Sequence, residues 1–297
     1  MNDMSQSPGD ELTAEQQWAQ FSTLTTADDY ISSLRGRNLN VYLLGERVDE
    51  PVDHPIIRPS INAMAESYQL AEDDPDLATA WSSISEQQIN RFLHVPESSL
   101  DLVQKNKMQR RMGQLTGTCF QRCAGLDTLS VLFSITYDID KQHGTPYHER
   151  FVSFLKKAQS HNLIVGAGMT DPKGDRSKRP SNQSDPDLFM HVTRRTKEGL
   201  YVKGAKAHMT GGLNSHWICV MPTMNMLEAD KDYAVIGMVP ATAPGLTYVY
   251  GRQSCDTRAL EPGDIDKGNA KYGGQETLVI FDDVFIPWAH VLMDGEY

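Results

Sequence analysis

The sequence predicts an α+β protein in which the helices come first and the strands follow. Apolar residues recur at helical spacing from about Thr26 to Leu163, and they alternate with polar residues after that point. Gly, Pro, Asn and Asp then interrupt the chain at short intervals, as turns between strands do. Because helices and strands do not alternate along the chain, the order argues against a parallel dinucleotide-binding sheet.

Length and composition are those of a globular protein with about two domains. The chain has 297 residues, of which 39% are hydrophobic and 23% charged. At about 150 residues per domain, we expect a disordered extension over 1–25, a helical domain over 26–160 and a β-rich domain over 161–297. Lys and Arg number 28 against 39 Asp and Glu, a formal charge of −11. This balance predicts no nucleic-acid surface, because phosphate binding needs clustered positive charge.

Several features predict a cytoplasmic location. No run of 18 or more apolar residues is present to predict a membrane span. The first 15 residues are acidic and polar, and they lack the basic-then-apolar pattern of a signal peptide. Four cysteines are too few for a disulfide scaffold, so the thiols are expected to be buried, catalytic or metal-bound.

Three helix starts stand out in the first half. Thr26 precedes two acidic residues, as an N-cap does. A second helix is expected to open at Ser60, after Pro59. A third follows Thr145 and Pro146, with Thr as the cap and Pro in the first turn. Its expected buried stripe comprises Tyr147, Phe151, Phe154, Leu155 and Ala158.

Between these starts, a long segment from Ser98 to about Ile139 predicts one or two helices. Gly113 and Gly117 lie in it one turn apart, which favours close helix packing.

The second half contains a predicted hairpin and four more strands. Residues 188–193 and 200–206 alternate around a turn at 197–199. Further strands are expected at 218–221, 234–239, 246–250 and 277–281.

The two cysteines of Cys119-Phe-Gln-Arg-Cys123 form the sharpest local feature. Their i, i+4 spacing inside a predicted helix sets both sulfurs on one face. Two such thiolates can ligate one metal centre, although the spacing is not the usual CxxC. Two small buried core cysteines fit the pattern as well, and the pattern alone favours them. Cys219 falls in an apolar strand and is expected to be core.

A polar loop joins the two halves. It can bind a polar ligand such as a phosphate-bearing one, and a solvated, salt-bridged loop is the equal alternative. Its residues are Met169, Thr170, Asp171, Pro172, Lys173, Gly174, Asp175 and Arg176.

Two further segments carry polar groups beside predicted strands. Residues 204–212 combine small residues with His208, Met209 and Thr210, as a pocket-lining loop or a plain turn does. Glu276 enters the strand 277–281 directly after Gly273-Gly-Gln. Desolvation there would raise its pKa and make it a candidate proton carrier, and a paired structural carboxylate is the alternative.

Together these segments resemble the 4-hydroxyphenylacetate 3-hydroxylase family. Residues 26–34, 41–48 and His54-Pro55 are typical of the family's opening, and the resemblance runs from about Thr26 to Tyr297. Within the family, the chain is most similar to the 4-hydroxybutyryl-CoA dehydratase, or vinylacetyl-CoA isomerase, branch. The strings that carry this likeness are 53–62, 119–123, 169–176, 204–208 and 273–276.

The resemblance implies an acyl-CoA-dehydrogenase-like fold with a helical domain, a middle antiparallel β domain and a C-terminal helical bundle. It also implies FAD, a [4Fe–4S] cluster beside the flavin, an acyl-CoA substrate and a homotetramer. Cys119 and Cys123 match two cluster ligands, and Glu276 matches a catalytic carboxylate. Residues 169–176 and 208–210 match flavin-contacting segments.

The activity so implied is dehydration of 4-hydroxybutyryl-CoA to crotonyl-CoA, with isomerisation of vinylacetyl-CoA. The β-proton that must leave is not acidic, and one-electron oxidation by flavin after α-deprotonation would make it so. Iron would act as the Lewis acid for the leaving hydroxyl, and Glu276 would assist proton transfer.

Two alternatives stay open. The hydroxylase branch uses reduced flavin and oxygen on phenols, and there we expect an Arg and a Tyr where Cys119 and Cys123 stand and a His near Ala167. None of the three is present, which disfavours that activity. A non-enzymatic subunit that binds a partner chain is the other alternative.

The resemblance also predicts more helices after the last strand, carrying a His and a Cys as the remaining cluster ligands. The sequence ends at Tyr297. We therefore expect these residues to form an N-terminal portion, without the C-terminal bundle, that exposes apolar surface and has low activity alone.

Overall fold

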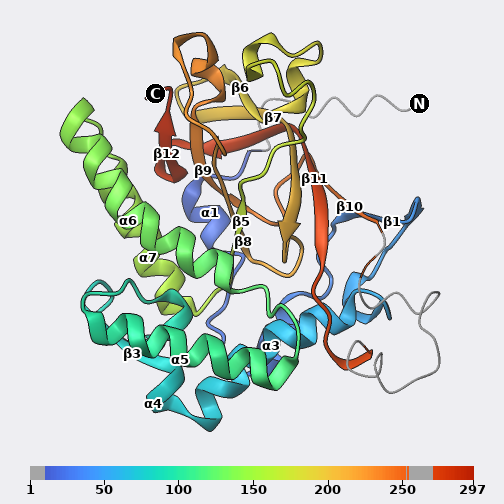
Figure 1. The fold of residues 1–297 in the computed structure, drawn as a ribbon, viewed down its shortest axis with the longest axis vertical. Helices are drawn as coiled ribbons and strands as arrows, with labels where there is room; N and C mark the ends of the chain where they lie inside the picture. The colour runs from blue at the N-terminus through green and yellow to red at the C-terminus, as the bar shows by residue number, and fades with distance from the viewer. Residues whose placement is uncertain (1–10, 252, 254–269) are drawn as a thin grey trace.

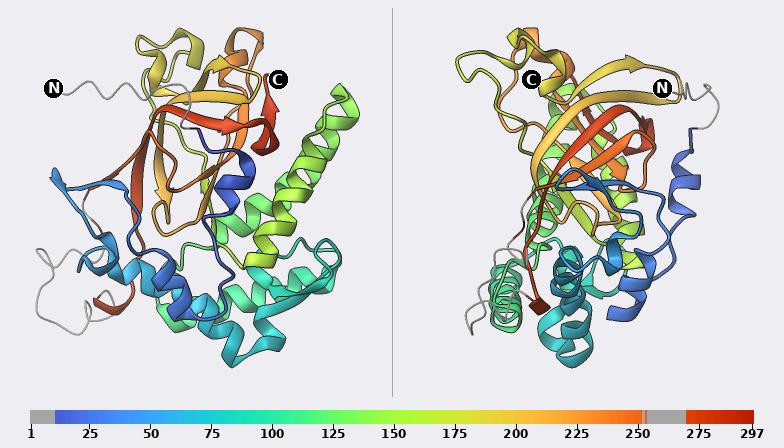
Figure 2. Two further views of the ribbon diagram at one scale, coloured as in Figure 1. Left: turned by 180° about the vertical axis from the view of Figure 1, so that it is seen from behind. Right: turned by 90° about the vertical axis from the view of Figure 1, so that its right-hand side faces the viewer.

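The computed structural model describes residues 11–251, 253 and 270–297, and it combines helices with sheets as predicted (Figures 1 and 2). Most of the helices gather at one end of the molecule and the two larger sheets at the other. The helices of the described residues are α1 (Ala14–Trp18), α2 (Ala27–Ser33), α3 (Arg58–Asp73), α4 (Pro75–Ala78), α5 (Ser99–Thr116), α6 (Cys123–His143) and α7 (Tyr147–His161).

The described strands form two larger sheets and one hairpin. Sheet order is β2-β1-β10-β11-β7-β6 in the first, β12-β9-β8-β5 in the second and β3-β4 in the hairpin. Two pairings, β1 with β10 and β5 with β8, are parallel, and the others are antiparallel. The strands are β1 (Asn40–Leu43), β2 (Glu46–Arg47), β3 (Thr79–Ser82), β4 (Gln87–Asn90), β5 (Val165–Gly168), β6 (His191–Arg195), β7 (Gly199–Thr210), β8 (Trp217–Val220), β9 (Val235–Pro240), β10 (Leu246–Tyr250), β11 (Glu276–Pro287) and β12 (Val291–Asp294).

The predicted hairpin and four further strands are confirmed as β6 to β11. Sequence reasoning missed β5, whose Val-Gly-Ala-Gly composition is poor in the β-branched and aromatic residues that mark strands. Each larger sheet packs apolar side chains into one continuous core that also takes in α2, α3 and α7.

Helix α2 begins as predicted. The Thr26 hydroxyl accepts a hydrogen bond from the Asp29 backbone N–H, and the Asp29 carboxylate accepts one from the Thr26 backbone N–H, which completes a capping box. The start of α3 lies two residues earlier than expected, with Pro59 in its first turn.

Helix α7 buries the predicted stripe of five apolar residues, but its cap is different. Thr145 does not cap the helix. Instead, the Asp140 carboxylate accepts hydrogen bonds of 2.8 Å from the backbone N–H groups of Tyr147 and His148. A remote acid at the end of α6 therefore does what the local Thr was expected to do.

The segment 98–139 forms two helices. Gly117 ends α5 with a φ of 63°, a left-handed conformation that favours Gly at a C-cap. Among the described residues, nothing lies within 4 Å of a Cβ built on Gly113 or on Gly117. The expected close helix packing at these two glycines is therefore wrong. Cys119 lies in the connection between α5 and α6, so the two cysteines do not share a helix.

The expected disordered extension differs from the structure over residues 11–25. Helix α1 has a complete capping box at Thr13, and Trp18 is only 6% exposed. The Trp18 indole N–H donates to Nε2 of His290, at 3.1 Å, which ties this segment to the far end of the chain. One helical turn cannot fold alone, and tertiary packing decides it.

Strands also occur within the part expected to be helical. Strand β1 joins the first sheet beside β10, and β3 with β4 forms a separate hairpin next to the helices. Within the described residues, every helix is too short or too polar to span a bilayer.

Candidate functional site

Residues 118–122 form a loop that packs against the segment leading into β11. The Gly274 N–H donates to the Thr118 hydroxyl at 3.2 Å. A Cβ built on Gly274 would lie 3.3 Å from Cβ of Cys119, so Gly at 274 permits this close approach. Figure 1 shows the start of β11 running down to the level of α3.

The two thiols meet although they do not share a helix. Cys119 is exposed in the loop, Cys123 begins α6, and their side chains are hydrogen-bonded to each other. That bond lowers the pKa of the Cys119 thiol to about 6 and raises the pKa of Cys123. At neutral pH the pair therefore holds one thiolate and one thiol, and the thiolate is the form that binds metal.

Glu276 lies beside this pair at the start of β11. The negative charge of Glu276 raises the pKa of Cys119, because the two side chains lie close together. The side chain reaches the surface, but the protein on one side excludes water from the carboxyl group and raises its pKa. The shift agrees in direction with the sequence-based expectation. Gln253 fixes the Glu276 backbone through two hydrogen bonds, of 3.0 and 3.1 Å.

Strand β7 supplies the neighbour that orients this carboxylate. Thr210 pairs with Glu276 across the two strands, and its hydroxyl donates to Oε1 at 2.7 Å. His208 is exposed with a φ of 51° and lowers the pKa of Glu276 against the larger effect of desolvation. Met209 is fully buried between them. His208, Met209 and Thr210 form the end of the long strand β7. The segment that was expected to be a pocket-lining loop or a plain turn is therefore the end of a strand.

The polar loop after β5 is anchored by a buried ion pair. Lys206 Nζ lies 2.6 Å from the carboxylate of Asp171, and the two side chains are 1% and 3% exposed. Lys206 also donates to the carbonyl oxygens of Met169 and Met221, at 3.2 and 2.8 Å. The Ala207 N–H donates to the Thr170 carbonyl oxygen at 2.7 Å, so this loop and β7 lie side by side. The Asp171 carboxylate is therefore committed to the protein itself.

The rest of that loop reaches solvent. Met169 is exposed, Thr170 and Pro172 are half-buried, and 173–176 are exposed. Gly174 has a φ of 50°, and the Asp175 carboxylate accepts two hydrogen bonds from Ser177. The loop thus presents its backbone and short polar groups outward over a rigid base.

Sequence reasoning missed three buried polar residues here. Gln121 has a φ of 63°, and its amide donates to the carbonyl oxygens of Ser60 and Gly273. The Arg122 guanidinium lies 5.0 and 5.1 Å from the ring centroids of Tyr68 and Phe92. Lys206 had a usable signal, a charged residue inside an apolar strand, whereas Gln121 and Arg122 had none.

The Cys119–Cys123 pair offers two thiol ligands to a metal centre. Two thiols, one of them ionised at neutral pH, are suitable cluster ligands. A [4Fe–4S] cluster needs about four protein ligands. Within the part of the chain that the structure describes, no group of three or more His, Cys, Asp or Glu side chains is arranged to hold a metal ion. Cys255 lies outside the described residues.

With this geometry established, comparison defines the class of protein. The family model described as 4-hydroxyphenylacetate 3-hydroxylase N terminal matches residues 26–293, and the chain belongs to that family.

Among individual relatives, the chain is more similar to a dehydratase than to an oxygenase. The chain is 52% identical to 4-hydroxybutyryl-CoA dehydratase/vinylacetyl-CoA-Delta-isomerase of Clostridium aminobutyricum, over 92% of this chain and 56% of that protein. It is 25% identical to the oxygenase component of 4-hydroxyphenylacetate 3-monooxygenase of Thermus thermophilus, over 91% of this chain and 55% of that one. The chain therefore spans about half the length of the curated relatives it matches.

Solved structures of the same two kinds of protein resemble this chain. An oxygen-tolerant archaeal 4-hydroxybutyryl-CoA dehydratase from N. maritimus has a TM-score of 0.89 and 61% identity, over 93% of this chain and 55% of that one. The oxygenase component (HpaB) of 4-hydroxyphenylacetate 3-monooxygenase, solved with FAD, shares the fold at a TM-score of 0.77 and 24% identity, over 92% of this chain and 56% of that one.

Proposed function

We propose that this chain is the N-terminal portion of an FAD- and [4Fe–4S]-dependent 4-hydroxybutyryl-CoA dehydratase that forms crotonyl-CoA and isomerises vinylacetyl-CoA. The observation that carries the proposal is that the loop before α6 brings Cys119 to Cys123 and close to Glu276, which Thr210 orients. The identity of 52% to the clostridial dehydratase supports the choice of reaction.

In this proposal, Cys119 and Cys123 are two cluster ligands. Cys119 is the more readily ionised of the two, and both would hold the cluster as thiolates. The remaining ligands would come from polypeptide beyond the described residues. When bound, the cluster would supply a Lewis acid for the leaving hydroxyl and the flavin would supply redox chemistry.

Glu276 is assigned to proton transfer. Partial desolvation raises the pKa of Glu276 above its usual value, the direction that suits a group that both takes and returns a proton. Thr210 holds Oε1, so Oε2 is the oxygen we assign to the substrate.

The flavin-contacting segments are assigned to the exposed parts of 169–176 and 208–210. They are joined through the Ala207–Thr170 hydrogen bond and so offer one continuous surface. Asp171 and Met209 are buried and support that surface from beneath. The proposal includes an acyl-CoA-dehydrogenase-like arrangement, with a C-terminal helical bundle and a homotetramer.

A chimaera tests this assignment. This chain replaces the matching part of the clostridial relative, and the product is purified without oxygen. We expect dehydratase turnover, bound flavin and an iron–sulfur absorption signal. Cys119→Ala should lose the iron signal, and Glu276→Gln should keep iron and flavin while turnover falls at least about 100-fold.

Cys219→Ala is the matched control, because that thiol is fully buried in the core. It should leave the iron content unchanged. Flavin binding without iron, or full turnover by Glu276→Gln, would contradict the proposal. Oxygen-dependent hydroxylation of a phenol in the presence of a flavin reductase would favour the hydroxylase activity instead.

A further inference from the structure

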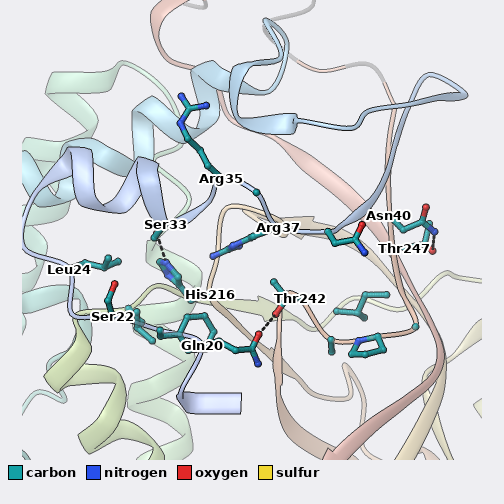
Figure 3. Close-up of a pocket in the computed structure, with 18 of the residues that line it drawn as sticks. Gln20, Ser22, Leu24, Ser33, Arg35, Arg37, Asn40, His216, Thr242 and Thr247 are labelled. Carbon is teal, nitrogen blue, oxygen red and sulfur yellow. Dashed lines mark hydrogen bonds between the residues drawn. The ribbon is translucent and has the colours of Figure 1, made fainter. Parts of the chain in front are cut away.

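A second site lies away from the thiol pair. A cavity of 760 Å³ opens between the α1–α2 connection, residues 33–40 and the turn at 242–247 (Figure 3). It shares no lining residue with the Cys119–Glu276 site or with the loop 169–176. Its volume lies within the range of about 300–1,000 Å³ that small-molecule pockets occupy.

Arg37 lines this cavity and carries a charge without an acidic partner. Its Nη1 donates to the carbonyl oxygens of Leu213 and Ser215, at 3.1 and 2.9 Å. Its Nη2 is buried and has no hydrogen-bond partner among the described residues. Burial lowers the pKa of Arg37 to about 10, and among the described residues the Tyr248 and Tyr30 phenols are the groups that act against this shift. The half-buried guanidinium has no anionic partner among the described residues, and a bound anion would supply one.

Neighbouring groups fit that anion. Arg35 lies at the rim, where the Asp53 carboxylate balances its charge by accepting from both Nη groups. Thr242 and Thr247 also line the cavity (Figure 3). The Thr242 hydroxyl donates to Oε1 of Gln20 at 3.2 Å, whereas the Thr247 hydroxyl accepts from the Asn40 amide at 2.7 Å and keeps its own proton for a ligand. Asp282 is the one carboxylate among the described lining residues, which also include Arg35 and Arg37.

His216 contributes no charge to the cavity. Its Nδ1 accepts from the Ile164 backbone N–H at 3.0 Å, so its Nε2 carries the proton and donates to the Ser33 hydroxyl at 2.9 Å. Burial and the nearby arginines hold the pKa of His216 well below its usual value. Figure 3 shows the Arg37 side chain reaching toward this Ser33–His216 pair.

We propose that this cavity binds a small phosphate-bearing anion, with its phosphate oxygens held by Arg37 and, at the rim, by Arg35. A guanidinium presents paired N–H donors that match phosphate geometry. The ligand's phosphate comes from either a free nucleotide or a coenzyme, and the binding arms below distinguish these two sources.

The test titrates the intact chain with inorganic pyrophosphate, ADP and coenzyme A, in separate arms, by calorimetry and thermal unfolding at constant ionic strength. We expect saturable binding of at least one of them, with a rise in Tm. Arg37→Met should weaken binding at least tenfold. Arg111→Met, at an exposed arginine on α5, is the control and should bind as the unchanged chain does.

Thr242→Glu provides a second variant that keeps Arg37. Its carboxylate would enter the cavity, occupy the place of the anion and abolish binding. Binding of ADP without coenzyme A identifies a free nucleotide, and the reverse identifies the coenzyme. Absence of binding in all three arms at millimolar concentration overturns the proposal. Unchanged affinity in either the Arg37→Met or the Thr242→Glu variant overturns it as well.

Discussion

At the scale of single residues, the sequence predicted that Cys119 and Cys123 lie together, but it predicted the wrong geometry for the pair. The spacing predicted two sulfurs on one helix face, yet Gly117 ends α5 before either cysteine is reached. The loop that follows brings Cys119 back to Cys123 at the start of α6. The hydrogen bond between them, rather than helix periodicity, sets which thiol ionises.

That hydrogen bond predicts the pH dependence of alkylation. The iodoacetamide reaction of Cys119 should be half-maximal near pH 6, because the thiolate is the reactive form and the pKa is about 6. In Cys123→Ala the donor is lost, and the half-maximum should move to higher pH. Mass spectrometry of the peptide that contains Cys119 measures both profiles. A half-maximum near pH 9 in the unchanged chain would contradict the prediction.

At the scale of elements, β7 ties two segments that the sequence presents separately. Lys206 on this strand reaches the loop after β5 through Asp171 and through two carbonyl oxygens. The pair fixes the outward surface of the loop from inside. Because both side chains are buried, each charge depends on the other.

Removing one partner of this ion pair should destabilise the fold. Lys206→Met leaves the Asp171 carboxylate buried and unpaired, and should lower the free energy of unfolding by about 3–5 kcal/mol. Lys206→Met with Asp171→Asn removes both charges and should recover much of that loss. Urea denaturation followed by tryptophan fluorescence measures both variants.

The matched control is Arg47→Met, in an exposed pair with Asp49 at 3.5 Å. It should unfold at the same urea concentration as the unchanged chain. Equal losses in the single and double variants at Lys206 and Asp171 would show that the ion pair is not the cause.

At the scale of the whole molecule, the helices and sheets share one main core. Buried residues from Trp18 to Met293 belong to a single cluster, and β1 inserts into the sheet beside β10. The expected division into 26–160 and 161–297 therefore follows the secondary structure more closely than the packing.

One shared core predicts cooperative unfolding. Circular dichroism at the helix band and tryptophan fluorescence should report the same urea midpoint, because neither part keeps its apolar surface buried without the other. Val41→Ala, at a fully buried position in β1, should shift both probes together. Two separated transitions would indicate that the parts fold independently.

The sequence by itself determined which segments are helices and strands over most of the chain. It also singled out candidate site residues, because caps, apolar periods and unusual polar residues are local signals. Thr26, the buried stripe of α7 and the raised pKa of Glu276 are of this kind.

Only the tertiary structure decided which of these groups meet. Asp140 capping α7, Trp18 held by His290, Lys206 beneath Asp171 and the lone charge of Arg37 all depend on contacts between distant segments. Burial and charge pairing are properties of neighbours in space, and no local pattern records them.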